Sequence, residues 1–149
     1  MIYLLIALMI GLAIAPLMHF LPSKRQRLQA RLREQAALAG LFVEFRDLPD
    51  SPAALERLPA VERQVLYYGK RLAPSRGKHR RAGSWMADGG SWRSVGERRE
   101  VPSLLSRLGP EIQAVSIDES SCGVYWTEQG DSDVVQQIAA VLDAWSDQV

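Results

Sequence analysis

The sequence predicts an α+β protein in which an N-terminal transmembrane helix precedes a small, mainly antiparallel sheet with helices on one face. Three observations predict this class. Residues 1–22 form an apolar run without a charged side chain, several later segments alternate apolar and polar residues, and residues 132–145 repeat apolar residues at helical spacing. Alternating strand–helix–strand units, which a parallel sheet requires, do not occur in the pattern.

Residues 1–22 have the length of a membrane span. At roughly 1.5 Å per residue they form a helix of about 33 Å, and a bilayer core is roughly 30 Å thick. A cleaved secretory signal is the main alternative, because Ala13-Ile14-Ala15 has the small residues of a cleavage site. The length of the run, the lack of a basic segment before it and Pro16 directly after that site favour an uncleaved anchor.

Basic residues follow the apolar run at once and give it an orientation. No acidic residue occurs before Glu34, and basic residues beside a span remain on the cytoplasmic side, so we expect the N-terminus outside and the domain in the cytoplasm. In this position the basic side chains favour contacts with lipid head groups over nucleic acid. They are Lys24, Arg25, Arg27, Arg31 and Arg33.

Three segments result: a transmembrane anchor at 1–22, a basic juxtamembrane helix at 23–40 and a cytoplasmic α+β domain at 41–149. Ser23 is the expected N-cap of the second segment, and Gly40 is its expected end. Within the anchor, Ala7, Gly11 and Ala15 recur every four residues, a spacing that lets two helices approach closely. Small residues are also common in such helices, and we favour this second interpretation.

The domain is expected to contain six strands. Residues 41–45 alternate in polarity, residues 64–72 are rich in bulky β-formers, and residues 83–92 contain the turn pair Asp88-Gly89. With that pair as the loop, Trp85 faces Trp92, either as hairpin packing, which we favour, or as a stacking surface for a ligand. The last two strands are expected at 112–118 and 122–128, after a short helix at 102–108. Ser132 is the expected N-cap of the final helix.

Charge is distributed unevenly along the chain. Residues 1–81 hold fourteen basic and six acidic side chains, a balance of plus eight, whereas residues 82–149 hold four and eleven, a balance of minus seven. The densest basic run is a candidate loop for an anionic ligand, although a solvated loop explains it equally simply. Its members are Arg76, Lys78, Arg80 and Arg81.

Signatures of catalysis and of metal binding are missing from the sequence. His19, His79 and Cys122 cannot supply a zinc site of usual spacing, and there is no phosphate-binding loop, dinucleotide fingerprint or nucleophile elbow. The acidic residues near 118 and 128 are explained by a strand-end turn and a helix N-terminus. We therefore expect no cofactor, no metal and no enzymatic activity.

The junction Leu21-Pro22-Ser23-Lys24-Arg25-Gln26-Arg27 resembles that of the small YajC-type accessory subunits of the bacterial Sec translocase, and more generally uncharacterised single-pass inner-membrane proteins of proteobacteria. The resemblance covers residues 1 to about 45 and implies a location in the bacterial inner membrane. It carries no functional residue across, because Ala39-Gly40-Leu41-Phe42-Val43 lacks the acid and the turn of the YajC-type strand.

Together these features predict a non-enzymatic binding or scaffolding subunit of a membrane complex. Its expected partners are the membrane and another protein or further copies of itself, whereas nucleic acid is not expected. The alternative is a membrane-tethered protein that binds nucleic acid or another anionic ligand through the basic loop at 76–81.

Overall fold

The computed structural model describes residues 1–18, 22–74 and 82–149. The chain forms two compact units, residues 1–30 and 31–149. The elements follow the order α1 (Ile2–Met18), α2 (Lys24–Leu38), β1 (Phe42–Asp47), α3 (Pro52–Leu55), α4 (Ala60–Arg63), β2 (Gln64–Arg71), β3 (Gly83–Asp88), β4 (Ser91–Val95), the 3₁₀ helix η1 (Ser103–Arg107), β5 (Ile112–Ile117), β6 (Ser121–Trp126) and α5 (Ser132–Ser146).

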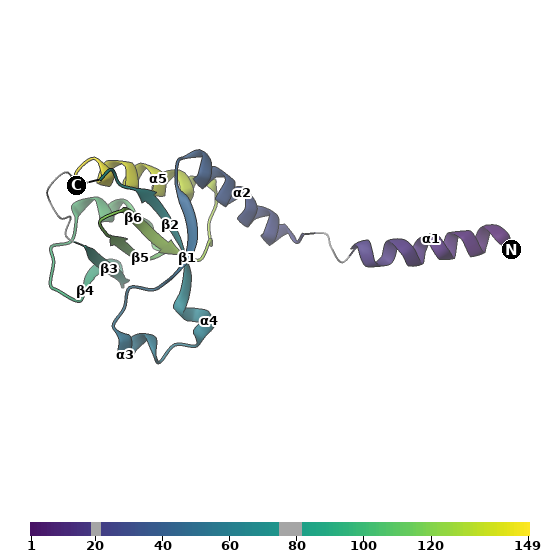
Figure 1. Cartoon of the computed structure of the whole chain (residues 1–149), viewed down its shortest axis with the longest axis horizontal. Coiled ribbons are helices and arrows are strands. Elements are labelled where there is room, and N and C mark those ends of the chain that lie inside the picture. Colours follow the sequence, from purple (N-terminus) through teal and green to yellow (C-terminus); the bar gives the residue numbers. More distant parts are fainter. Residues whose placement is uncertain (19–21, 75–81) are drawn as a thin grey trace. The chain divides into compact units, whose positions relative to one another are not determined.

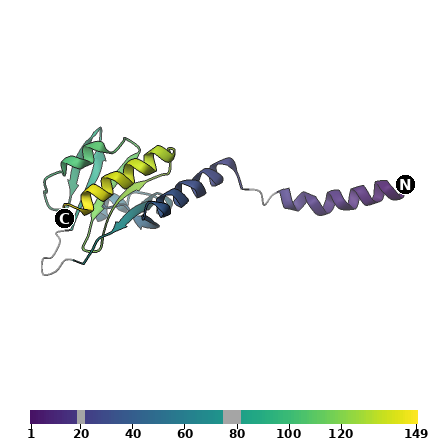
Figure 2. The same ribbon diagram turned by 90° about the horizontal axis from the view of Figure 1, so that it is seen from above.

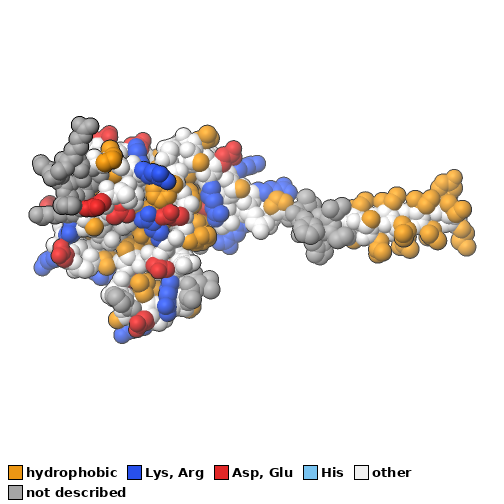
Figure 3. All heavy atoms as spheres, in the orientation of Figure 1, with side chains coloured by type: hydrophobic (Ala, Val, Ile, Leu, Met, Phe, Trp, Pro, Cys, Tyr) orange, Lys and Arg blue, Asp and Glu red, His pale blue; other side chains and the backbone are white. Residues whose placement is uncertain are grey.

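Helix α1 is apolar around its whole circumference, and its side chains from Ile2 to Ala15 are exposed (Figure 3). Nevertheless, no helix among the described residues combines the length and apolar character needed to cross a membrane. The 17 residues of α1 span roughly 26 Å, less than a bilayer core of about 30 Å. The predicted transmembrane anchor at 1–22 was therefore wrong. The single-pass inner-membrane location was inferred from that anchor and was wrong with it, and the cytoplasmic placement of the domain, inferred in the same way, is no longer supported.

Helix α2 begins and ends where the sequence predicts. Ser23 Oγ accepts a hydrogen bond from the backbone N–H of Gln26 at 3.2 Å, and Gln26 Oε1 accepts one from the Ser23 N–H at 2.8 Å, which makes a reciprocal capping box. At the other end Gly40 has a φ of +77°, and the Leu41 N–H donates to the Ala36 carbonyl at 2.9 Å. This left-handed glycine closes the helix and directs the chain into β1.

The six strands form one sheet in the order β1-β2-β6-β5-β3-β4, and every neighbouring pair is antiparallel (Figure 1). This confirms the α+β class. Within the sheet, strands β1, β2, β6 and β5 form one group and the β3–β4 hairpin forms another. The backbone pairing between β5 and β3 connects the two groups.

The main core lies between one face of the sheet and α5, which both ribbon views show lying against the sheet (Figure 2). Alternate β6 residues, Val124 and Trp126 among them, are buried in this core together with the apolar face of α5. The Trp85 and Trp145 rings lie 5.8 Å apart there. The N-cap of α5 is Asp131, which accepts a hydrogen bond from the Asp133 N–H at 3.1 Å, one residue before the predicted Ser132.

A smaller cluster covers the opposite face, centred on Tyr67 and Tyr125. The Tyr67 ring lies directly over two glycines, because a Cβ built on either Gly69 or Gly123 would lie 2.4 Å from a ring carbon. The Arg46 guanidinium stacks on this ring, 3.9 Å from its centroid. Burial raises the pKa of Tyr67 to about 12, which keeps its hydroxyl protonated beside Ser121.

The hairpin of β3 and β4 differs from the predicted register by one residue. Its loop is Gly89-Gly90, with φ of +55° and +91°, so Asp88 pairs with Ser91 and Ala87 pairs with Trp92. Two adjacent glycines suit a turn that requires positive φ at both central positions better than Asp88 does. The predicted facing pair of tryptophans was therefore wrong: Trp85 pairs with Ser94 and is buried, whereas Trp92 is only partly buried.

Candidate functional site

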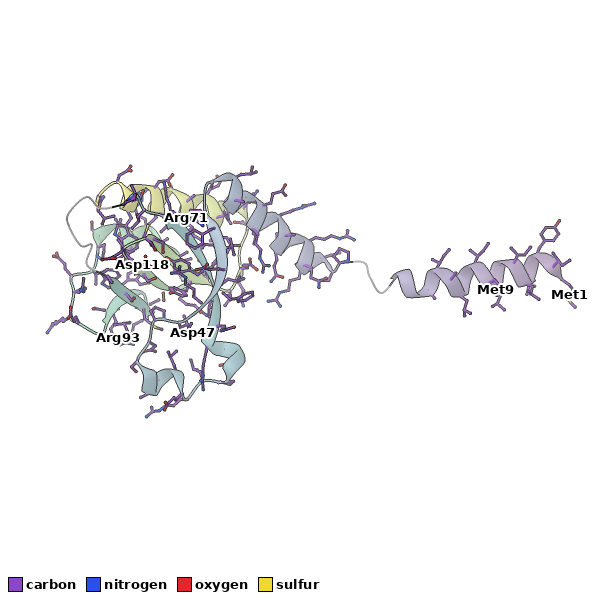
Figure 4. The ribbon with its side chains drawn as sticks, viewed as in Figure 1. Met1, Met9, Asp47, Arg71, Arg93 and Asp118 are labelled. Atoms are coloured by element: carbon purple, nitrogen blue, oxygen red, sulfur yellow. The ribbon has the colours of Figure 1, made fainter. Side chains whose placement is uncertain are left out.

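A cleft of about 1170 Å³ opens at one end of the sheet. The last residues of β1, β3 and β6 and the first residues of β2, β4 and β5 meet there, because all strand pairs are antiparallel. In Figure 4, Asp47 marks this end, where the chain leaves β1 toward α3, whereas Arg71 and Asp118 mark the other end. The segment that carries α3 and α4 extends from the cleft end and adds Leu58 and Glu62 to the lining.

The cleft forms where the sheet parts. The pairing of β3 with β5 stops at Met86 and Ala114, although β3 continues to Asp88 beside β4 and β5 begins at Ile112. On its other side β5 has an irregular register against β6 between Ile112 and Ala114, which leaves Gln113 as an extra residue. Such a bulge bends a strand and re-aims its side chains, and bulges are frequent beside binding sites. The hairpin and β5 therefore separate as they approach the cleft.

The lining is largely apolar and almost uncharged. Glu62 is the only ionisable side chain among the described residues that line it. Phe45, on edge strand β1, is 65% exposed. Larger apolar side chains of the lining are Phe45, Leu66, Met86, Trp92, Leu108 and Trp126.

Two polar groups of the lining have no hydrogen-bond partner among the described residues. They are Nε1 of Trp126, whose side chain is fully buried, and Oε1 of Gln113, the bulge residue. By contrast, Nε1 of Trp92 donates to the Leu105 carbonyl at 3.2 Å. Both atoms are buried below the surface of the cleft, and Oε1 of Gln35 and Nε1 of Trp85, which do not line it, are unpaired in the same way, so these atoms do not mark a ligand site.

Apart from Trp92, the side chains singled out from the sequence lie elsewhere. Ala7, Gly11 and Ala15 are exposed on α1, and a Cβ on Gly11 would meet no other atom within 4 Å. Their candidate role in helix packing stays a prediction. Arg76, Lys78, Arg80 and Arg81 of the predicted anionic-ligand loop lie outside the described residues, as do His19 and His79.

Of the five basic residues predicted to contact lipid, four are exposed and form no ion pair within the described residues: Lys24, Arg25, Arg27 and Arg31. The fifth, Arg33, donates two hydrogen bonds to Glu128, at 2.7 and 2.9 Å. The Glu128 side chain is fully buried and also accepts a bond from the Tyr68 hydroxyl at 2.7 Å. These bonds raise the pKa of Arg33 and fasten this part of α2 to the segment after β6.

Glu128 also adopts an uncommon backbone conformation, with a φ of +55°. Non-glycine residues rarely occupy this region, and the three hydrogen bonds to the carboxylate offset the strain. The sequence interpretation explained the acidic residues here jointly by a strand-end turn and a helix N-terminus. This holds for Asp118 and Asp131, whereas the partner of Glu128 is Arg33, 95 positions away in the chain.

The described residues contain no group of three or more His, Cys, Asp or Glu side chains able to hold a metal ion. Cys122 is buried, and its Sγ lies 3.9 Å from the Leu142 carbonyl oxygen. The cleft, rather than a cluster of ionisable groups, is therefore the candidate site that this part of the chain offers.

Comparisons of the chain with protein-family models, with curated proteins and with solved structures find no match. The resemblance of the N-terminal junction to YajC-type subunits accordingly stays a prediction.

Sequence reasoning missed the cleft. Its residues come from stretches of the chain that are scattered between Phe45 and Thr127, and none of these stretches carries a motif. The one local signal was the Gly89-Gly90 turn beside Trp92, which placed a large aromatic side chain next to a tight hairpin at a strand end.

Proposed function

We propose that residues 31–149 form a non-enzymatic binding module that receives an apolar segment of a partner protein in the cleft. The observation that carries the proposal is the cleft itself, a large, open and nearly uncharged hollow bounded by partly exposed aromatic side chains. Large contiguous apolar areas that stay accessible in a folded domain mark sites that bind other proteins or ligands.

The composition of the lining supports binding over chemistry. Proton transfer needs positioned acid and base groups, and Glu62 is the single ionisable side chain in the described lining. The cleft, with a volume of about 1170 Å³, has room for a segment of another polypeptide, and we favour such a segment as its occupant.

The test is photo-crosslinking from inside the cleft in cells that express the full chain. A photoreactive phenylalanine analogue is placed at Ala87, an exposed residue of the lining, and in a separate protein at Ala82, which is also exposed but lies at the far end of β3. We expect a discrete adduct with another protein from position 87 and none from position 82.

A variant that fills the cleft supplies the matched control. Ala87→Arg adds a long charged side chain to the apolar lining, whereas Ala82→Arg adds the same side chain outside it. In both variants the photoreactive phenylalanine analogue replaces Phe45. Crosslinking of the partner from this position should be lost in the Ala87→Arg protein and kept in the Ala82→Arg protein. Adducts that form equally from positions 87 and 82, or that still form in the Ala87→Arg protein, contradict the proposal. Adducts with a second copy of this chain would show that the cleft mediates self-association and does not bind a different protein.

A further inference from the structure

Strand β1 lies at one end of the sheet and pairs on one side only, with β2. Two hydrogen bonds that extend the ladders of β2 show which backbone groups of β1 face inward. The Leu48 N–H donates to the Arg63 carbonyl at 3.0 Å, in the register of β1 with β2, and the Leu72 N–H donates to the Ser120 carbonyl at 2.8 Å, in the register of β2 with β6. Because bonding sides alternate along a strand, both bonds assign the even-numbered residues of β1 to β2.

The odd-numbered residues of β1, which are Val43, Phe45 and Asp47, therefore direct their N–H and C=O groups to the outer edge. No described residue forms a hydrogen bond with the backbone of these three. The side chains of Phe45 and Asp47 are exposed along this edge. Proteins often protect an edge strand with a proline or a bulge, but β1 has no proline and an unbroken register. The edge can therefore receive another strand.

A second copy of the chain can present the same edge in the antiparallel direction, provided that outward residues meet outward residues. Two registers of this kind overlap most of the strand. In the first, Glu44 faces the partner's Glu44, and like charges directly opposite each other are unfavourable. In the second, Phe45 faces the partner's Phe45 on the two-fold axis, and Glu44 faces the partner's Arg46 twice. The second register also brings Phe42 opposite Leu48, two apolar side chains of the same face.

The ion pairs distinguish the two registers, and the backbone and Phe45 supply the attraction. Glu44 and Arg46 already pair within the strand, and their side chains are 46% and 29% exposed. Pairs between such partly exposed groups add little affinity, but they penalise the wrong alignment. In the favoured register Phe45 bonds to Phe45 and Val43 bonds to Asp47 through the backbone, while the two Phe45 rings cover each other.

We infer that β1 pairs with β1 of a second copy of this chain, antiparallel, with Phe45 on the two-fold axis and Glu44 opposite the partner's Arg46. The two sheets then continue into each other across this edge. This inference goes beyond the proposed function, because it needs no occupant in the cleft.

Single cysteines in the full chain test the pairing and its register. One protein carries Glu44→Cys, a second carries Arg46→Cys, and isotope labelling of the second distinguishes their masses. In the inferred register these cysteines face each other at a position without backbone bonds, where the Cβ atoms are close enough for a disulfide. The remaining Glu44 and Arg46 still face each other. After mild oxidation of the mixture we expect at least ten times more disulfide between the two proteins than between copies of either one. Cys122 is buried and common to both.

A proline variant tests whether the backbone edge makes the contact. Asp47→Pro removes an outward N–H and no bond to β2, and proline is accepted on the open side of an edge strand. Asp47→Ala keeps this N–H and is the matched control. Introduced into both cysteine proteins, Asp47→Pro should lower the disulfide yield about tenfold, whereas Asp47→Ala should change it less than about twofold. Circular dichroism of each variant checks that the fold is kept.

Three results overturn the inference: no disulfide, equal yields for all combinations of the two proteins, or a preference for copies of Glu44→Cys joined to each other. A yield that Asp47→Pro leaves unchanged also overturns it. The proposed function is judged separately, by crosslinking to a different protein from position 87. Adducts between two copies from position 45 are expected from the β1 edge, whereas such adducts from position 87 report on the cleft.

Discussion

Replacement of Arg33 by methionine should destabilise residues 31–149 by about 3 kcal/mol. Met keeps the aliphatic stem but removes both hydrogen bonds to Glu128, a carboxylate with no exposed side-chain area. Breaking a buried ion pair from one side costs roughly 3–5 kcal/mol, because the remaining charge is left without its partner. The Arg33 side chain is 43% exposed, so water reaches part of the vacated space and the lower end of this range applies.

Denaturant unfolding of the full chain, followed by near-ultraviolet circular dichroism of the buried tryptophans, measures this loss. The thermal midpoint should fall by roughly 10 °C for a domain of this size. Arg31→Met is the matched control, because Arg31 is exposed on the same helix and should change the free energy of unfolding by less than about 0.5 kcal/mol.

A double variant separates loss of the ion pair from loss of packing. Glu128→Gln removes the buried charge, so Arg33→Met combined with Glu128→Gln should be about 1 kcal/mol more stable than Arg33→Met alone. The reasoning is refuted if Arg33→Met costs less than about 0.5 kcal/mol, or if the two single losses simply add.

Two further predictions concern Asp118, in the turn after β5, and Gly123, which lies under the Tyr67 ring on the face of the sheet away from α5. Partial burial disfavours the charged form of Asp118, but hydrogen bonds from Ser120 and Ser121 outweigh it and lower its pKa below 3.8. The stabilising effect of the Asp118 carboxylate is therefore present above the unfolded-state pKa and is lost as pH falls through the folded-state pKa. The difference in the free energy of unfolding between wild type and Asp118→Asn should thus shrink between about pH 6 and about pH 2. A difference that is constant with pH contradicts this prediction. Gly123→Ala places a Cβ 2.4 Å from the Tyr67 ring and should lower the free energy of unfolding of residues 31–149 by about 1–3 kcal/mol, measured by denaturant unfolding. Gly11→Ala is the control, because its Cβ would meet no atom within 4 Å, and it should leave the unfolding of residues 31–149 unchanged. Equal unfolding midpoints for both variants would show that the Tyr67 ring moves aside freely.

Elements with a local physical cause were predictable. The capping box at Ser23, the left-handed end at Gly40 and the apolar face of α5 depend on residues within a few positions of each other. The strands of the domain followed from alternation, with boundaries shifted by one or two residues. Where two local signals competed, the prediction failed: Asp88-Gly89 and Gly89-Gly90 both suit a tight turn, and the register of the whole sheet selects the second.

Features that join distant segments were not predictable. Arg33 follows an apolar run and so was interpreted as a head-group contact, but its partner Glu128 becomes a neighbour only when α2 packs beside the end of β6. The length of α1 is a similar case, because the composition of residues 1–22 indicates a span while the described helix stops at Met18.

The sequence by itself determined the α+β class, the two ends of α2 and the alternation of the strands, since each of these depends on side-chain chemistry at short range. Only the tertiary structure decided where those strands lie in the sheet and therefore where β3 and β5 part. The cleft with Trp126 and Gln113 exists because non-consecutive strands end at the same edge, an arrangement set by long-range packing that no local pattern records.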